Sequence, residues 1–341
     1  MGCIMIGIVD ACEKYFYDEL KSLKSRKFYF KQKKLARLLE TPFEKIDRDQ
    51  RSTLIAYAFH LHCRLLPLGV KHRVIECSGV KCPDELKLGY EQLKEELENG
   101  SDLMSRLSTR IKQIDYSDGM FADWGITHFH LGKRSKNRVE RTGPIAYAYL
   151  VRDEAYIIMI GEHGRWSDQA IFDKLLNEHP HLGEMHNIGV SPSAVADTAA
   201  KDRPKFRKEY INTFTKSGDC VYLPLGGGVT KNGVMVDAAI QCNRLYKRLR
   251  IYADIIELNE RKIYEGLKAE FCRDEYPEYR FDGLKMSAYG IIWPFELTPY
   301  DATIVFDDWG AVLVCATGEK VIRCMEWLRV RFYFVEKMTV I

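Results

Sequence analysis

The spacing of apolar residues separates a mainly helical first part of the chain from a strand-rich middle. Up to about residue 117, apolar positions recur at the three- and four-residue spacing of amphipathic helices. This pattern predicts helices within 10–25, 41–66, 82–100 and 101–114. Two of them end at recognisable stop signals, Pro67-Leu68-Gly69 and Asn99-Gly100.

After Asp118-Gly119 the pattern changes to the alternation that is typical of strands. Strands are predicted over 125–132, 143–152 and 154–164, and the last two are joined by a short charged turn, as in a β-hairpin. Ser167-Asp168 then caps a short helix that closes at His179-Pro180. The middle of the chain is therefore expected to form a compact module of three strands and a helix.

The remainder of the chain predicts further mixed structure. Residues 191–210 are small and polar and are interpreted as a connection, whereas 237–271 carry a long amphipathic helical pattern, in one piece or two. The tail is β-rich, with a short helix near 319–327. These patterns predict an α+β fold with three consecutive regions: a mainly helical region at 1–117, the central module at 118–190, and an α+β region at 205–341.

Composition and charge limit the class of protein. With 46% hydrophobic and 29% charged residues the chain is expected to be globular, and a net charge of +3 places any basic surface in local segments, such as 21–37 and 133–141. No apolar run reaches the length of a membrane span, so no membrane partner is expected.

The ten cysteines include no C-x-x-C pair, which favours reduced thiols in a cytoplasmic protein. A zinc site built from His60, His62, Cys77 and Cys82 would need an irregular ligand spacing, so this interpretation is not favoured.

The central module concentrates side chains that carry chemistry. Strand alternation places His128 and His130 on one face together with Ile126. His163 follows the third predicted strand. Between these histidines lies a cationic loop, and with the arginine after His163 it supplies the candidate substrate-binding residues Lys133, Arg134, Arg138, Arg141 and Arg165. Histidines titrate near neutral pH and arginines stabilise a phosphoryl transition state, which suits cleavage of RNA by its own 2′-hydroxyl without a cofactor.

The basic loop, the hairpin and the ending Ile160-Gly161-Glu162-His163-Gly164-Arg165-Trp166 resemble the terminal hairpin of RelE/HigB-type toxin ribonucleases, over about residues 123–166. Those hairpins often end in Ile-Gly-His-Arg; here Glu162 stands before His163, and Gly164 precedes Arg165. The resemblance implies a toxin or phage-defence nuclease acting on RNA, with a protein inhibitor as a possible partner. It also places His163 and Arg165 at the terminal acid/base or phosphate-binding positions.

Two other interpretations stay open. In the first, His128, His130 and His163 hold a divalent metal ion for a hydrolase, with Asp123 or Glu162 completing the set. In the second, the histidines have no catalytic duty and lie on a solvent-facing strand. The protein is then a non-enzymatic nucleic-acid-binding or protein-interaction factor. The later group His179, His181 and His186 is interpreted as a capping and loop cluster.

Overall fold

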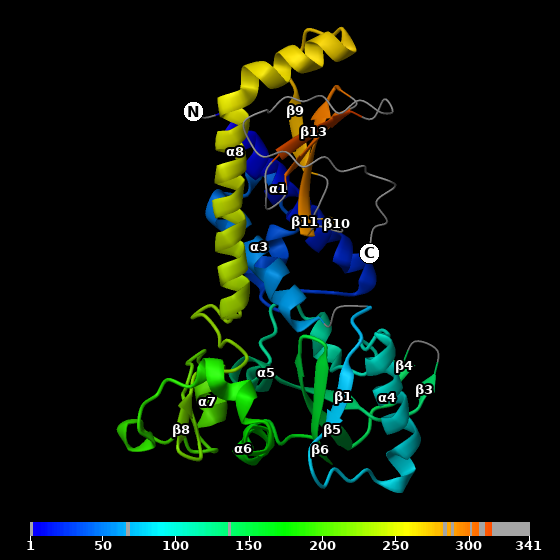
Figure 1. The fold of residues 1–341 in the computed structure, drawn as a ribbon, viewed down its shortest axis with the longest axis vertical. Coiled ribbons are helices and arrows are strands. Elements are labelled where there is room, and N and C mark those ends of the chain that lie inside the picture. Colours follow the sequence, from blue (N-terminus) through cyan, green and yellow to red (C-terminus); the bar gives the residue numbers. More distant parts are fainter. Residues whose placement is uncertain are drawn as a thin grey trace. The chain divides into compact units, whose positions relative to one another are not determined.

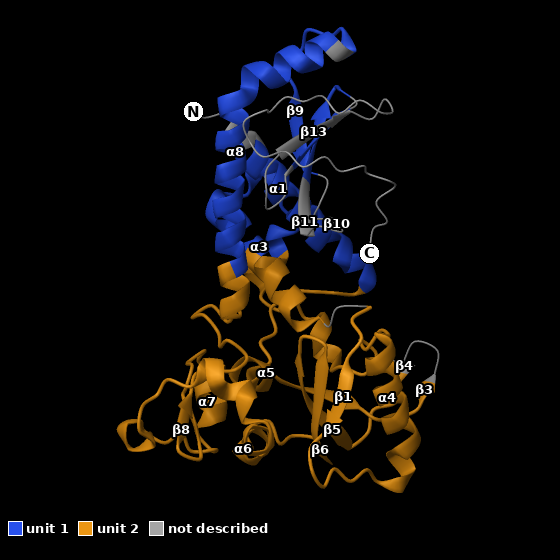
Figure 2. Ribbon diagram, in the orientation of Figure 1, with its two compact units in different colours: residues 1–26, 37–55, 241–341 blue, residues 27–36, 56–240 orange. Residues whose placement is uncertain are grey.

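The computed structural model describes residues 3–65, 69–135, 138–281, 285–287, 290–300, 302–306 and 311–315 (Figure 1). The chain has the predicted α+β fold. Its contacts group into two compact units (Figure 2): unit 1 comprises 1–26, 37–55 and 241–341, and unit 2 comprises 27–36 and 56–240. Unit 1 therefore draws on the first and third of the regions predicted from the sequence, and unit 2 draws on all three.

The centre of unit 2 is a four-stranded sheet with the strand order β1-β6-β5-β2. Its strands are β1 (Arg73–Glu76), β2 (Ile126–His130), β5 (Pro144–Val151) and β6 (Glu154–Glu162). The three strands predicted from alternation pair antiparallel, with β5 between β2 and β6. The edge strand β1, which the sequence pattern did not reveal, adds to β6 in parallel.

Helices cover the two faces of this sheet. On one face, α4 (Lys87–Asn99) packs Tyr90, Leu93 and Leu97 against apolar side chains of β2, β5 and β6. On the other face, α5 (Gly119–Trp124) and α6 (Gln169–Glu178) form a second core with Trp124 and Phe172 fully buried. Burying the apolar stripe of each helix against the sheet is the main force that holds this unit together.

Unit 2 is completed by short elements. These are the strands β3 (Arg134–Ser135), β4 (Arg138–Val139), β7 (Thr215–Ser217) and β8 (Cys220–Tyr222), the helix α7 (Arg203–Lys208), and the 3-10 turns η3 (Asp84–Leu86), η4 (Thr109–Lys112), η5 (Pro180–His186) and η6 (Pro192–Ala194). β3 pairs with β4, and β7 pairs with β8.

Unit 1 contains α1 (Cys3–Ser22), η1 (Leu23–Arg26), η2 (Phe43–Lys45) and an antiparallel sheet. The strands of that sheet are β9 (Glu278–Phe281), β10 (Lys285–Ser287), β11 (Gly290–Thr298), β12 (Ala302–Phe306) and β13 (Ala311–Cys315). In its interior the buried carboxylate of Glu13 lies 3.3 Å from Arg51 and accepts a 2.7 Å hydrogen bond from Tyr246. The residues of α2 (Lys33–Leu38), α3 (Arg48–Arg64) and α8 (Val236–Phe271) are divided between the two units.

The structure corrects two of the sequence-based expectations for secondary structure. The helix predicted over 101–114 is wrong: Asp102 accepts a hydrogen bond from the Met104 N–H, and Ser108 accepts one from Arg110, so side chains hold turns there instead. The stretch interpreted as a connection contains α7. By contrast, α8 is the long helix that was expected, in one piece. The helix predicted near 319–327 and the last β-rich stretch lie outside the described residues.

Among the helices that the structure describes, none combines the length and the apolar character needed to cross a membrane.

Candidate functional site

The first two site histidines lie on β2, and the face they occupy is the predicted one. Ile126 belongs to the core under α5 and α6, whereas Phe129 packs against α4 on the opposite face. His128 and His130 therefore point to the α5–α6 side, opposite Tyr147 and Ile145 of β5. They are not on a solvent-facing strand, because they are only 7% and 5% exposed.

A β-bulge brings the third histidine to the same face. Tyr147 pairs with Met159 and Ala148 pairs with Ile157, so Ile158 is an extra residue in β6. Ile158 and Met159 both contact the α6 core, and Ile160 returns to the α4 side. Strict alternation from Ile158 would have turned Glu162 toward the α6 side. The bulge shifts the alternation by one residue, so His163 faces the β2 histidines instead.

The three imidazoles converge. The ring centroids of His128, His130 and His163 lie 5.7–6.0 Å apart, and one nitrogen from each ring lies within 4.8 Å of the others. A tetrahedral zinc ion with bonds of about 2.0–2.1 Å needs donor atoms roughly 3.3–3.5 Å apart. Side-chain rotations that move each nitrogen by about an ångström would therefore bring the three donors to that spacing. We call His128, His130 and His163 the histidine triad.

The indole of Trp166 closes one side of the triad. Its ring lies 4.7 Å from those of both His128 and His163. Ring contacts of this kind restrict the orientation of both imidazoles.

The environment of His128 and His130 favours uncharged rings. Burial lowers the pKa of His128, which also lies beside His163 and Arg141, and Asp118 only partly opposes this effect. Burial, Arg141 and the other two imidazoles lower the pKa of His130 to about 4. Nε2 of His128 and Nδ1 of His130 are buried and have no hydrogen-bond partner in the structure. Neutral rings with unpartnered nitrogens are in the state that a metal ion requires of its ligands.

A buried ion pair, which sequence reasoning missed, holds His130 in place. Arg106 is fully buried, and its guanidinium lies against both carboxylate oxygens of Glu96. It also donates a 3.0 Å hydrogen bond to the backbone carbonyl of His130, and the His130 N–H donates one of 2.9 Å to the Arg106 carbonyl. These two hydrogen bonds fix the backbone at the end of β2, from which the His130 side chain projects.

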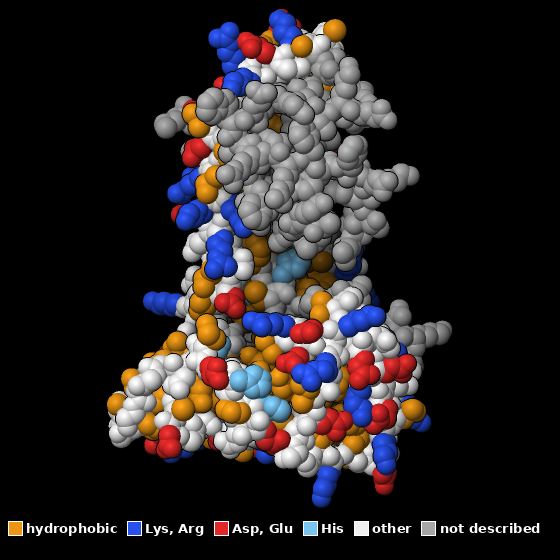
Figure 3. All heavy atoms as spheres, in the orientation of Figure 1, with side chains coloured by type: hydrophobic (Ala, Val, Ile, Leu, Met, Phe, Trp, Pro, Cys, Tyr) orange, Lys and Arg blue, Asp and Glu red, His pale blue; other side chains and the backbone are white. Residues whose placement is uncertain are grey.

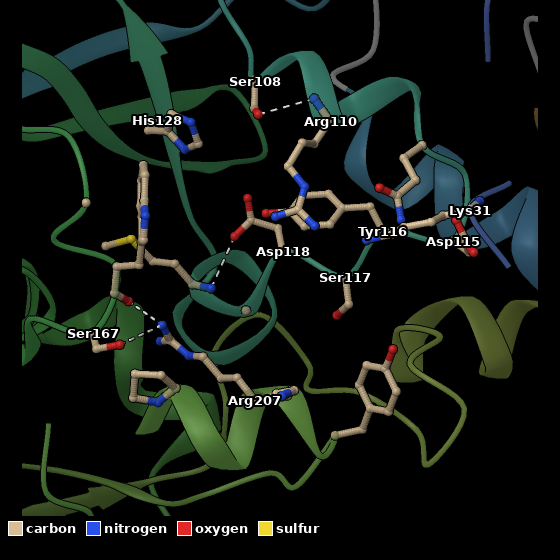
Figure 4. A pocket seen from close by; sticks show the side chains of 18 of the residues that line it. Lys31, Ser108, Arg110, Asp115, Tyr116, Ser117, Asp118, His128, Ser167 and Arg207 are labelled. Atoms are coloured by element: carbon tan, nitrogen blue, oxygen red, sulfur yellow. Dashed lines mark hydrogen bonds between the residues drawn. The ribbon is translucent and has the colours of Figure 1, made fainter. Parts of the chain in front are cut away.

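The triad opens onto a pocket of about 1,010 Å³ within unit 2. His128 and His163 reach its wall, and Figure 4 shows His128 on the opposite side from Tyr116 and Arg110. The lining is rich in cations and aromatic rings, with two carboxylates; it includes Lys31, Arg110, Asp115, Tyr116, Asp118, Trp166, Arg207, Lys208 and Tyr210. On the face drawn in Figure 3, histidine side chains reach the surface of unit 2 beside hydrophobic side chains, around α5.

Two arginines of the lining are held by defined contacts. The guanidinium of Arg110 lies 3.9 Å from the ring of Tyr116. Arg207, from α7, donates a 2.7 Å hydrogen bond to Asp123 and others to the Trp166 carbonyl and the Ser167 hydroxyl (Figure 4). One terminal nitrogen of Arg207 is buried without a partner. The pocket therefore presents a positioned cation next to the indole that packs on the triad.

The substrate-binding residues predicted from the sequence have mixed positions. Arg141 lies near the triad, with its guanidinium donating a 2.6 Å hydrogen bond to the Leu107 carbonyl. Arg165 instead pairs with Asp168, and Arg134 lies 3.0 Å from Glu96. Lys133 is exposed, and the side chain of Arg138 lies outside the described residues. The basic loop is thus only partly directed toward the histidines.

The acidic residues considered as further ligands are not part of the cluster. Asp123 is buried and pairs with Arg203 and Arg207 at 3.6 and 2.7 Å. Glu162 is exposed and is absent from the ligand groups found among the described residues. His60 is occupied elsewhere, since its Nε2 lies 2.8 Å from the Tyr116 carbonyl and its Nδ1 accepts from the Met235 N–H.

Comparison of the chain with protein-family models, with curated proteins and with solved structures finds no match. The function of the chain must therefore be inferred from the geometry of the site.

Proposed function

We propose that the histidine triad binds a divalent metal ion of the zinc class and that unit 2 is a metal-dependent hydrolase of phosphate esters, with RNA as the leading substrate. The observation that carries this proposal is the convergence of three ring nitrogens within 4.8 Å, two of the rings being buried with unpartnered nitrogens. Three histidines with one open position are the ligand set of several catalytic zinc sites. The ion would supply a Lewis acid that polarises a phosphoryl oxygen and makes a bound water acidic.

The low pKa of His130 favours this chemistry over metal-free acid/base catalysis. An efficient general base has a pKa near the working pH, and His130 is one of the two candidate bases for metal-free cleavage. With a pKa of about 4, His130 carries a proton in only roughly one molecule in a thousand at pH 7. The metal-free ribonuclease expected from the sequence, with His128 or His130 as base and His163 as acid, stays a prediction.

The lining of the pocket supports a phosphate-bearing substrate. Arg110 and Arg207 are positioned cations on its wall, and Lys31 and Lys208 are exposed at the same pocket. Tyr116 and Trp166 offer aromatic faces on which bases stack in single-stranded nucleic acid. A volume of about 1,010 Å³ accommodates a short stretch of nucleotides rather than a single small ion.

The test measures cleavage of labelled single-stranded RNA, single-stranded DNA and a small phosphodiester by the full chain. Each substrate is tested before chelation, after chelation, and after zinc or manganese has been added back. We expect cleavage that chelation removes and a metal restores, and that is lost in His128→Gln and His163→Gln. His186→Gln is the matched control, since His186 belongs to neither ligand group. Cleavage that survives chelation but needs the histidines would favour the metal-free ribonuclease. Salt-sensitive RNA binding without cleavage in any state would favour the binding factor.

A further inference from the structure

A second group of side chains that can bind a metal ion lies at the C-terminal end of α6. Cys77 directly follows β1, and its N–H donates a 2.9 Å hydrogen bond to the Ile157 carbonyl of β6. Glu178 is the last residue of α6, and His179 is the capping residue that follows it. The edge of the sheet and the end of the helix thus bring together a thiol, a carboxylate and an imidazole.

The geometry of this group matches that of the triad. Cys77 Sγ, a carboxylate oxygen of Glu178 and a ring nitrogen of His179 all lie within 4.8 Å of one another. Cys77 is 3% exposed, and Nε2 of His179 is buried without a hydrogen-bond partner. The His179 ring packs edge-on against Tyr156 at 4.7 Å, which restricts its orientation.

The carboxylate is also held in place. Glu178 accepts hydrogen bonds of 2.6 Å from the Ser78 N–H and 2.8 Å from the Ser78 hydroxyl, and Lys174 lies 3.6 Å away. These bonds use one acceptor position on each oxygen, and an ionised carboxylate oxygen offers two. Glu178 therefore keeps capacity for an ion while its own hydrogen bonds orient it, as the outer contacts of metal ligands do.

We propose that Cys77, Glu178 and His179 form a second ion site, which takes zinc through one sulfur, one oxygen and one nitrogen donor and fastens β1 to the end of α6. Zinc accepts all three donor types, whereas magnesium and calcium take oxygen donors. Binding converts the thiol to a thiolate, and the proton leaves to solvent. Without an ion, burial raises the pKa of Cys77 to about 11, and the negative charge of Glu178 adds to this rise. The thiol therefore stays protonated and unreactive.

This site does not depend on the proposed hydrolase, because the two groups share no residue. The ion would link the edge strand β1, which the sequence pattern did not reveal, to the end of α6, and a water molecule would take its fourth position. The same ion would hold the C-terminal end of α6. The N-terminal end of this helix begins shortly after Trp166, which lines the pocket.

The test is cobalt titration of the metal-depleted full chain, read in the near-ultraviolet for the thiolate-to-cobalt band. We expect this band in the wild type and in His128→Gln, and its loss in Cys77→Ser and in His179→Gln. Cys63→Ser is the matched control, because burial raises the pKa of the Cys63 thiol to about 11 as well. Should a variant fail to fold, competition in the wild type decides the question: zinc added to the cobalt-loaded chain should remove the thiolate band, because the thiolate then binds zinc. A missing thiolate band in the folded wild type, or a band that persists in folded Cys77→Ser, would overturn the proposal, whatever the RNA assays show.

Discussion

The charge state of His130 gives the most quantitative prediction. Burial first, then Arg141 and the neighbouring imidazoles, lower its pKa from 6.5 to about 4. At 1.36 kcal/mol for each pKa unit, the folded protein prefers the neutral ring over the charged one by ~3 kcal/mol relative to the unfolded chain. We therefore expect His130 to stay uncharged throughout the physiological range.

The sign of the pH dependence follows from linkage. Because the folded pKa lies below the unfolded value, folding excludes a proton, and the metal-free protein loses stability as the pH falls from about 6.5 toward 4. At pH 4.5, the difference in protonation of this ring between the unfolded and folded states lowers the free energy of unfolding by about 2–3 kcal/mol. His130→Gln should lack this share of the acid sensitivity.

The assay is an NMR titration of the histidine side chains in the metal-free protein, with His130→Gln identifying the His130 signal. The expected midpoint is near 4. Exchange of the amide protons of β5 at pH 7 and pH 4.5, corrected for intrinsic rates, measures the accompanying loss of stability. A midpoint near 6.5, or equal acid sensitivity in the wild type and His130→Gln, would refute the reasoning about burial.

Deleting Ile158 removes the bulge and should turn His163 to the opposite face of the sheet, so that the triad loses one ligand. Zinc affinity measured by calorimetry should then fall, and an unchanged affinity would contradict this prediction. Arg106→Ala removes the buried partner of Glu96 and leaves the His130 carbonyl without its donor, while Arg134 still lies 3.0 Å from Glu96. The free energy of unfolding, measured by chemical denaturation, should fall by about 1–3 kcal/mol, and no measurable loss would show that the contact is dispensable. Gly89→Ala places a Cβ 1.7 Å from the backbone carbonyl oxygen just after β2, so α4 must move off the sheet. The expected cost is about 3 kcal/mol or more, and a thermal unfolding midpoint equal to that of the wild type would contradict the close packing.

Local patterns predicted the parts of the fold that local physics decides. The alternation in 126–130 placed His128 and His130 on the correct face, because a strand with one buried core face has its register fixed by that pattern. The amphipathic pattern after Asp237 likewise predicted α8. The helix expected over 101–114 failed because Asp102 and Ser108 satisfy backbone N–H groups in turns.

The candidate site was predictable only in part. Its three histidines are visible in the sequence, but the bulge at Ile158 that makes them converge depends on pairing between β5 and β6. Arg207 joins the pocket from a segment whose small and polar residues resembled a connection. The only sequence feature that pointed to Arg207 was the run of basic residues in α7. That run is far from the histidines in the sequence, and no local pattern relates the two.

The central claim, that the histidine triad holds a metal ion, is tested most directly by equilibrium dialysis against zinc at pH 7.5. The metal-depleted wild type should bind one more ion per chain than the triple variant His128→Gln, His130→Gln, His163→Gln, while His186→Gln should match the wild type. Equal zinc content in the wild type and the folded triple variant would contradict the account.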